Sequence, residues 1–570
     1  MSTEPLWSLG ERAASALAPE TDLFADQDVA EFNRALTSAL RGAAGHPASA
    51  AAAAALFASR LVQIPGAALA RWLGTEDQPP VELDPKDRRF ADPAWRENPA
   101  YYSLRLLYEA IGRLSDDLVD AAGTDELTTA KARMASRFLL DAAAPTNFLP
   151  TNPAALKRAF ETGGMSLLRG AGHFVDDVLH NEGRPRQVDT RPFVLGENMA
   201  ATPSRVVYRN ELMELLQYEP RTPQVHAAPL LCSPPWINKY YVMDLAPGRS
   251  FIEWAVDHGR TVFAISYRNP GAEMSGVTLD DYLLHGPRTA FDVIQDITGA
   301  ETIDIVGLCL GGALTVITDA YLTGQGDSRV GTLTLLNTMV DYADPGALKL
   351  FTDERTVARI EKQMAKEGHL PGKSMAGTFD VMRANDLIFN YVVSNWLLGQ
   401  EPPAFDILAW NADATRMPAA MHSFYLRNFY VENKLAKGEL EVAGSIIRLD
   451  EIKHDTYVVS AENDHIVPWR SAYLTTQLVS GPSRFVLSSG GHIAGIVNPP
   501  GPKPWHLVLD GQLPPTAEEW RAAAERRTGS WWEDWAGWSA ERSGPMVDPP
   551  RMGSDTHPVI EPGPGRYVHT

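Results

Sequence analysis

Three residue types that can form a nucleophilic catalytic unit follow one another along the chain: Cys309, Asp464 and His492. A cysteine thiolate can attack a carbonyl carbon, a histidine can accept the thiol proton, and a carboxylate can orient the histidine. The spacings are 464 − 309 = 155 and 492 − 464 = 28 residues. These residue types predict acyl transfer through a covalent intermediate on cysteine, provided that the fold brings them together.

The cysteine stands in a glycine-rich turn. An apolar run at 303–306 leads into Gly-Leu-Cys-Leu-Gly-Gly at 307–312, and residues 313–321 favour a helix. A sharp strand-to-helix turn crowds the backbone around the nucleophile, and residues without a Cβ atom relieve that crowding. At the start of a helix, the helix dipole also favours a negatively charged sulfur. We therefore expect a nucleophile elbow with cysteine in the place of the usual serine.

The acid and the histidine each follow a predicted strand. Residues 457–460 lead into a polar loop that presents Asp464, and residues 484–487 lead into Ser-Gly-Gly-His, where two glycines let the loop turn His492 back over the sheet edge. The order nucleophile, acid, histidine is that of the α/β-hydrolase fold. Cys309 alone could be a buried structural thiol, and each polar loop residue alone could be solvated or capping, but strand context at all three positions favours a triad.

The elements that must position these residues alternate between strand and helix. The alternation predicts a mostly parallel sheet covered on both faces, within residues 206–570. It stops after the strand at 332–336 and resumes near 457, so we interpret about 344–449 as a cap inserted over the active site. Residues 1–205 show helical patterns and predict a mainly helical N-terminal domain. The fold prediction is therefore α/β, an α/β-hydrolase fold with an inserted cap and a helical N-terminal domain.

Two apolar segments allow alternative interpretations. Residues 48–73 are rich in alanine, but Pro65 and two arginines interrupt them, which argues against a transmembrane segment. Phe57, Leu61 and Ile64 share one helical face, and packing against the protein itself is favoured over contact with a lipid-like or polymer surface.

The C-terminal tail holds four tryptophans within residues 529–538. A helix that docks on the core is favoured over a surface for a hydrophobic partner or product.

The composition fits a large soluble enzyme of 570 residues with 44% hydrophobic residues. A net charge of −20 argues against nucleic acid as a partner, since phosphate binding needs clustered lysine and arginine. Only Cys232 and Cys309 are present, which suits a reducing cytoplasm, and the acidic residues Glu4 and Glu11 argue against a secretory signal. No phosphate-binding glycine loop and no Cys/His metal spacing occur, so neither cofactor nor metal is expected.

Further motifs match one family pattern. They are the elbow at 307–312, Pro-Pro-Trp-Ile-Asn-Lys-Tyr-Tyr at 234–241, Ser-Tyr-Arg-Asn-Pro at 266–270, Asp-His-Ile-Val-Pro-Trp at 464–469, Phe-Ala-Asp-Pro-Ala-Trp at 90–95, Asn-Asp-Leu at 385–387, Trp-Asn-Ala-Asp-Ala-Thr-Arg at 410–416, and the tryptophan tail. In combination they resemble the polyhydroxyalkanoate (poly-3-hydroxybutyrate) synthases, over nearly all of the chain after about residue 85. The long N-terminal domain resembles the single-subunit (class I-like) kind.

The resemblance implies an acyltransferase that polymerises (R)-3-hydroxyacyl-CoA thioesters into polyester and releases coenzyme A through a cysteinyl acyl-enzyme. It implies a cytoplasmic enzyme at the surface of polyester granules, active as a homodimer, with granule-coating proteins as further partners. Motifs 236–238 and 266–268 are most similar to the short-chain branch. Leu308 and Leu310, however, depart from the familiar elbow residues and leave the acyl-chain length open.

The resemblance also implies roles for other residues. The backbone N–H of Leu310 and one from residues 235–237 would hold the oxyanion. His465 and Arg383 become candidates for contacting coenzyme A, although a structural salt bridge is an equally good interpretation of Arg383. Asp464 either orients His492 or helps it to activate the 3-hydroxyl of the acyl group.

Two other classes of protein remain open. A cysteine-dependent acyl-CoA thioesterase or hydrolase on the same fold would release free hydroxy acid. A non-catalytic granule-coating protein could also keep the fold, but an intact triad in the hydrolase order argues against it.

Overall fold

The computed structural model describes residues 26–75 and 78–570. The chain divides into two compact units. The first comprises Met1–Asp189 and Ser374–Pro403, and the second comprises Thr190–Lys373 and Ala404–Thr570. The segment 344–449, interpreted above as a cap, is therefore divided, because its part Ser374–Pro403 folds with the N-terminal helices.

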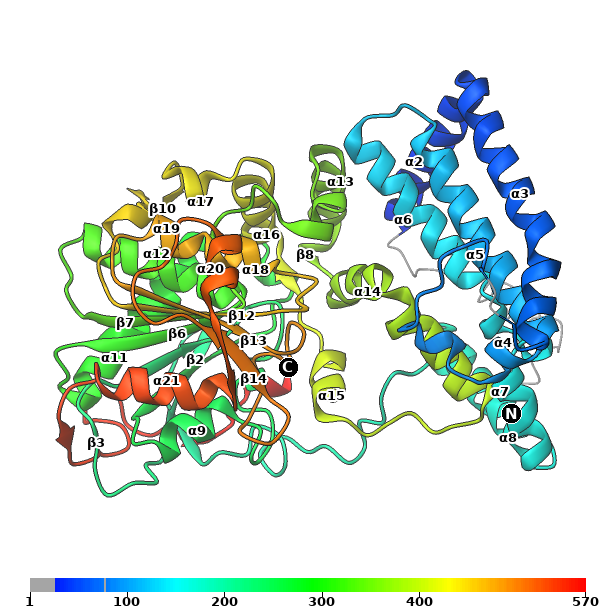
Figure 1. The fold of residues 1–570 in the computed structure, drawn as a ribbon. Coiled ribbons are helices and arrows are strands. Elements are labelled where there is room, and N and C mark those ends of the chain that lie inside the picture. The colour runs from blue at the N-terminus through cyan, green and yellow to red at the C-terminus, as the bar shows by residue number, and fades with distance from the viewer. Residues whose placement is uncertain (1–25, 76–77) are drawn as a thin grey trace. The chain divides into compact units, whose positions relative to one another are not determined.

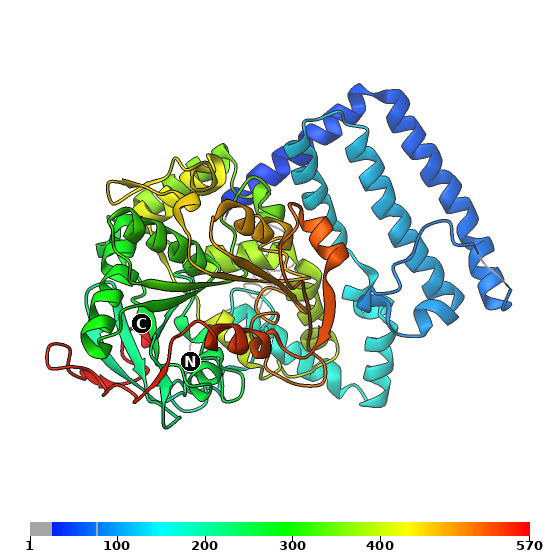
Figure 2. The ribbon, with the colours of Figure 1, turned by 60° about the vertical axis from the view of Figure 1, so that its left-hand side comes forward.

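The first unit is built from helices, the longest of which pack side by side (Figures 1 and 2). Polar side chains define where they begin: Asn98 and Asp125 each accept backbone N–H groups of the helix that follows. The helices are α2 (Asp26–Gly45), α3 (Pro47–Trp72), α4 (Ala94–Glu97), α5 (Pro99–Asp120), α6 (Glu126–Ala142), α7 (Pro153–Glu161), α8 (Met165–His180), α14 (Gly372–Met382) and two π-type turns, Asn385–Phe389 and Val392–Leu397.

Helix α3 packs against α5 with one face. Ile64 lies in a core with Tyr102 and Leu106, and the partly buried Phe57 and Leu61 pack against that core. The interpretation of these residues as a self-packing face is thus confirmed. Pro65 does not end the helix, contrary to the sequence argument. By length and composition alone, α3 could therefore cross a membrane. A single helix of this kind is weak evidence for a membrane span.

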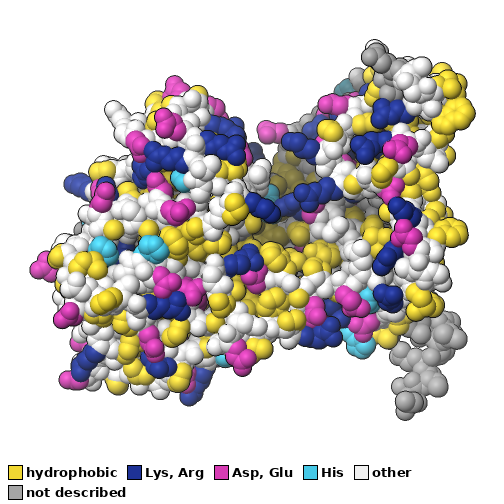
Figure 3. All heavy atoms as spheres, turned by 60° about the horizontal axis from the view of Figure 1, so that its bottom comes forward, with side chains coloured by type: hydrophobic (Ala, Val, Ile, Leu, Met, Phe, Trp, Pro, Cys, Tyr) yellow, Lys and Arg dark blue, Asp and Glu magenta, His cyan; other side chains and the backbone are white. Residues whose placement is uncertain are grey.

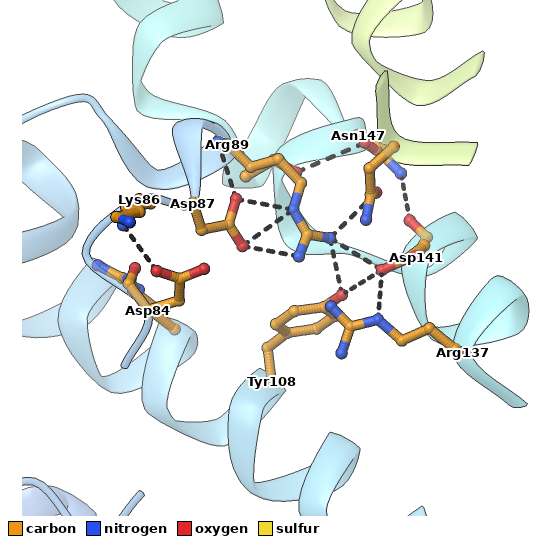
Figure 4. Close-up of polar contacts among 11 residues, drawn as sticks. Asp84, Lys86, Asp87, Arg89, Tyr108, Arg137, Asp141 and Asn147 are labelled. Carbon is orange, nitrogen blue, oxygen red and sulfur yellow. Dashed lines mark hydrogen bonds and ion pairs between the residues drawn. The ribbon is translucent and has the colours of Figure 1, made fainter. Parts of the chain in front are cut away.

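A polar network of buried and half-buried side chains surrounds Arg89 (Figure 4), and Asn385 of the second chain segment contacts it. The Arg89 guanidinium lies 2.7 Å from Asp87 and 3.0 Å from Asp141, and donates to the Tyr108 hydroxyl at 2.9 Å and to the side-chain oxygen of Asn385 at 3.2 Å. Burial is the main cause that raises the pKa of Tyr108 to about 12, so the phenol stays neutral. The hydrogen bond of Asn385 is one of several that hold this segment against the N-terminal helices; the Trp396 indole also donates to Asp177 at 2.8 Å.

The second unit is organised by one 11-stranded sheet in the order β15-β14-β13-β12-β7-β6-β4-β5-β2-β1-β17. Its six central strands are parallel, as predicted, and antiparallel strands extend both edges. The parallel strands are β4 (Leu230–Ser233), β5 (Val262–Tyr267), β6 (Ile303–Leu308), β7 (Val330–Leu336), β12 (Thr456–Ala461) and β13 (Ser483–Ser488). The outer strands are β1 (Ser204–Arg209), β2 (Met213–Tyr218), β14 (Trp505–Val508), β15 (Glu525–Thr528) and β17 (Glu561–Pro562).

Helices cover both faces of this sheet, so its central strands are fully buried. In Figure 1, α9 (Phe251–Asp257) and α21 (Trp531–Ala540) lie on one side, and α12 (Leu310–Gly324) and α18 (Trp469–Tyr473) lie on the other. Further helices of the unit are α10 (Leu279–Leu283), α11 (Thr289–Thr298), α13 (Glu354–Glu367), α15 (Asp406–Ala412) and α16 (Ala419–Tyr425). This is the α/β-hydrolase architecture that the alternation predicted.

Acidic and basic side chains are interspersed on the faces of both units that Figure 3 shows. Neither face carries a broad basic patch of the kind that binds nucleic acid.

Candidate active site

Cys309 lies in the turn between β6 and α12. Its backbone has φ 53° and ψ −115°, a strained conformation for a residue with a side chain. The Cys309 N–H donates to the carbonyl of Leu336 at 2.8 Å, and the hydroxyl of Thr338 donates to the Cys309 carbonyl at 3.3 Å. These bonds to the end of β7 hold the turn, and the thiol stays partly exposed at the N-terminus of α12.

Three glycines make this turn sterically accessible. An added Cβ atom would lie 2.4 Å or less from another heavy atom at Gly307, Gly311 and Gly312. At Gly311 that atom is the carbonyl oxygen of Ser233, only 2.1 Å away. The crowding predicted from the sequence is confirmed, and it arises from the close approach of neighbouring loops and side chains.

Asp464 and His492 lie in the loops that follow the adjacent strands β12 and β13, and backbone hydrogen bonds join these loops. Gly490 has φ +113°, which only glycine adopts readily and which turns the second loop back toward the first. One Asp464 oxygen lies 2.7 Å from Nδ1 of His492, and the other accepts the N–H groups of Ile466 and Val467 at 2.8 and 3.0 Å. The carboxylate is thereby fixed toward the imidazole.

The electrostatics of this pair favour an imidazolium. The side chains of Asp464 and His492 are 0% and 9% exposed. Burial opposes protonation of His492, but the Asp464 carboxylate and the Cys309 sulfur outweigh it and raise the pKa of His492 well above its usual value. Because Nδ1 faces Asp464, Nε2 is the nitrogen that can serve the hydrogen bond with Cys309. The arrangement can hold a thiolate beside an imidazolium.

The tryptophans of α21 brace the loop that carries His492. Trp531, Trp532 and Trp535 are each at most 1% exposed. The indole N–H groups of the first two donate to the carbonyls of Gly495 and Ile496 at 3.0 and 2.9 Å. The docking-helix interpretation of the tryptophan tail is confirmed, and the helix fastens the backbone just beyond the histidine.

The loop after β4 runs beside the elbow. The Ser233 hydroxyl donates to the carbonyl of Gly311 at 3.3 Å, and a Cβ atom added at Gly311 would lie 2.5 Å from the carbonyl oxygen of Pro234. Leu310 begins α12, so its N–H has no acceptor within the helix. The start of α12, which holds Leu310, therefore contacts residues 233 and 234, directly before the second predicted source of oxyanion donors at 235–237.

Three tyrosines that the sequence analysis did not single out lie close enough to Cys309 to interact with it electrostatically. Tyr342, Tyr425 and Tyr430 each interact electrostatically with Cys309, and the Tyr425 hydroxyl donates to that of Tyr430 at 3.4 Å. Tyr425 and Tyr430 come from one segment and Tyr342 from another, about eighty residues earlier, so no spacing pattern identifies the three together. The aromatic richness of residues 421–430 was the only signal.

Comparison with known proteins agrees with this architecture. A family described as "Poly-beta-hydroxybutyrate polymerase (PhaC) N-terminus" matches residues 86–255, and the "alpha/beta hydrolase fold" family matches residues 237–499. The poly(3-hydroxyalkanoate) polymerase of Methylorubrum extorquens is 40% identical over 97% of this chain and 92% of its own length. The chain belongs to the poly(3-hydroxyalkanoate) polymerase family. The PhaC subunits of Rhizobium meliloti and Cupriavidus necator are 38% and 41% identical, over 98% and 85% of this chain and 93% and 83% of their own lengths.

This family is one of enzymes, and the resemblance drawn from the motifs is confirmed. The remaining predicted site residues divide between the two units. His465 follows Asp464 directly and is partly exposed in the second unit. Arg383 belongs to the first unit, where it is ion-paired with Asp386 and lines a cavity of about 510 Å³ together with Arg133 and Arg137.

Proposed function

We propose that the protein polymerises (R)-3-hydroxyacyl groups from CoA thioesters into polyhydroxyalkanoate, with Cys309 as the covalent carrier. The observation that supports this most is the contact of Cys309 with a buried His492–Asp464 pair at the ends of neighbouring strands. A cysteine suits the reaction because it exchanges one thioester for another at almost no thermodynamic cost, whereas a serine would hold the acyl group as a more stable oxygen ester.

In the loading step, His492 takes the proton of Cys309, and the thiolate attacks the thioester carbonyl. The N–H of Leu310 and one from residues 235–237 stabilise the oxyanion. The carbon–sulfur bond to coenzyme A then breaks, and the leaving thiolate takes the proton back from the imidazolium. Cys309 now carries the acyl group.

In the extension step, a 3-hydroxyl attacks the carbonyl of an acyl group held as a thioester. His492 accepts the hydroxyl proton, an ester bond forms, and the thiolate that leaves is reprotonated. Asp464 either orients the imidazole or strengthens it as the base. Chain growth requires that water be kept from the acyl-enzyme, and the buried aromatic residues of 419–430 in the proposed cap support such exclusion.

The CoA moiety carries phosphates, and two features support candidate contacts for it. Arg383 shares its cavity with Arg133 and Arg137, and guanidinium groups bind phosphate well. The same cavity also holds carboxylates, and Asp386 is ion-paired with Arg383. His465 stands next to the triad acid. Within this proposal we assign His465 as a substrate contact of the second unit and Arg383 as a candidate phosphate contact of the first unit.

We place the enzyme in the cytoplasm at the surface of polyester granules, as a homodimer that meets granule-coating proteins. The exposed apolar side chains of Val62, Leu69 and Trp72 on α3, which are 81%, 53% and 64% exposed, support contact with a hydrophobic surface. Deleting residues 47–72 should lower the fraction of protein that co-sediments with granules. Unchanged attachment would remove α3 from the proposal.

Incubation of the purified protein with 3-hydroxybutyryl-CoA tests the function. Thiol release is followed while insoluble polyester and soluble free acid are weighed. Polymer supports the proposal; free acid alone would make the protein a cysteine thioesterase, and no thiol release would refute both. Cys309→Ala should abolish release, whereas the matched variant Cys232→Ala, at a buried cysteine in β4, should retain it.

A further inference from the structure

The three tyrosines beside Cys309 form one cluster. Tyr342 follows β7, Tyr425 ends α16, and Tyr430 lies in the helical turn that follows. The ring centroid of Tyr430 lies 4.9 Å from that of Tyr342 and 5.5 Å from that of Tyr425, with ring planes at 75° and 84°. Such edge-to-face contacts fix the rings, so the positions of the hydroxyl groups are set by packing.

The hydroxyls of this tyrosine cluster bond mainly to one another. Tyr425 donates to Tyr430, and the hydroxyl of Tyr342 also interacts with that of Tyr425. Burial raises the pKa of all three phenols, so each keeps its proton and can donate. Two contacts among three hydroxyls use two protons, which leaves one proton to donate to a further acceptor.

The side chain of a fourth donor packs against the same cluster. The ring of Trp236, in the loop after β4, lies 5.9 Å from that of Tyr425, and the tryptophan is 2% exposed. Its indole N–H has no hydrogen-bond partner in the described part of the chain. A buried donor without a partner costs about 1–3 kcal/mol, which a bound acceptor would recover. The phenol hydroxyls and the indole N–H thus provide hydrogen-bond donors that an acceptor oxygen could satisfy.

We propose that the tyrosine cluster binds the oxygen on C3 of the acyl group that Cys309 carries. This assignment rests on the proposed function. A 3-hydroxyacyl group, or a polyester chain attached through the same carbon, places an acceptor oxygen three carbons from the thioester, next to the nucleophile. A plain acyl group has no oxygen there, so the cluster would select hydroxyacyl over acyl thioesters.

Comparing 3-hydroxybutyryl-CoA with butyryl-CoA, which lacks only that oxygen, tests the proposal. For wild type and Tyr425→Phe, kcat/KM is measured from thiol release with 3-hydroxybutyryl-CoA, and the inhibition constant of butyryl-CoA is measured in the same assay. We expect Tyr425→Phe to lower kcat/KM about three- to tenfold, the loss of one hydrogen bond, and to leave the inhibition constant unchanged. Tyr430→Phe is the second variant, with the same expectation.

Tyr473→Phe is the matched control, because it also removes the hydrogen bond of a buried phenol, here to the carbonyl of Pro514. It should change neither constant. Equal losses for both ligands in Tyr425→Phe, or no loss for either, would overturn the assignment. If wild-type protein releases no thiol from 3-hydroxybutyryl-CoA, the proposed function fails, which is a different result from an unselective loss in an active enzyme.

Discussion

Replacing Asp464 by asparagine tests whether the carboxylate sets the charge state of Cys309 and His492. Asparagine keeps the size of the side chain and can still accept the N–H groups of Ile466 and Val467. It removes the negative charge 2.7 Å from His492 Nδ1, in a fully buried position. A hydrogen bond to a charged group contributes about 1.5–3 kcal/mol.

That loss corresponds to about one to two pKa units, since one unit is about 1.4 kcal/mol. The direction follows from the charges. The carboxylate favours the imidazolium, so without Asp464 the imidazole of His492 loses its proton at a lower pH. The pair of charged Cys309 and His492 loses about that stabilisation relative to the neutral pair, so iodoacetamide should alkylate Cys309 up to about 10- to 100-fold more slowly in Asp464→Asn.

The assay is the rate of iodoacetamide addition across pH, read by mass spectrometry. It reports Cys309 selectively, because Cys232 is 1% exposed and burial raises its pKa. Asp319→Asn is the matched control, since Asp319 is a buried aspartate that lies 3.0 Å from His454 in the same unit. An unchanged rate in Asp464→Asn would refute the reasoning, and an equal loss of rate in both variants would indicate general destabilisation.

Three further substitutions follow from the packing. Gly311→Ala places a Cβ atom 2.1 Å from a backbone carbonyl, so it should lower the Tm by several degrees, an effect of about 1–3 kcal/mol; an unchanged Tm would contradict the described elbow. Arg260→Gln leaves the buried Asp304, 2.6 Å away, without its ion-pair partner, and should lower the free energy of unfolding in urea by about 3–5 kcal/mol. A decrease of less than about 1 kcal/mol would show the pair to be dispensable. Trp532→Phe keeps an aromatic ring but loses one hydrogen bond to the loop beyond His492, so we expect about 1 kcal/mol lower stability and slower thiol release; retained rates would separate α21 from catalysis.

Local chemistry accounts for what could be predicted from the chain. The glycines of 307–312 are needed by a turn a few residues long, and the strand before each of Cys309, Asp464 and His492 is a short apolar run. Such features depend on neighbours in sequence, so a pattern can reveal them. The assignment of the three residues to catalysis stays a prediction that the proposed assays test.

Long-range packing produced what no pattern indicated. Residues 344–449 read as one insertion, but the contacts of Asn385 with Arg89 bind part of it to the N-terminal helices. Pro65 was expected to break an apolar segment, yet it lies within a continuous helix that packs on α5.

The types and order of the residues were enough to indicate an α/β-hydrolase fold, a cysteine elbow and an acid–histidine pair. Each depends on short-range sterics or on the order of consecutive strands along the chain. The tyrosine cluster beside Cys309 and the bracing of the His492 loop by α21 were decided only in three dimensions. The cluster joins Tyr342 to residues about eighty positions later, and α21 bonds to carbonyls about 36 residues earlier. These partners are selected by burial and donor–acceptor matching rather than by spacing along the chain.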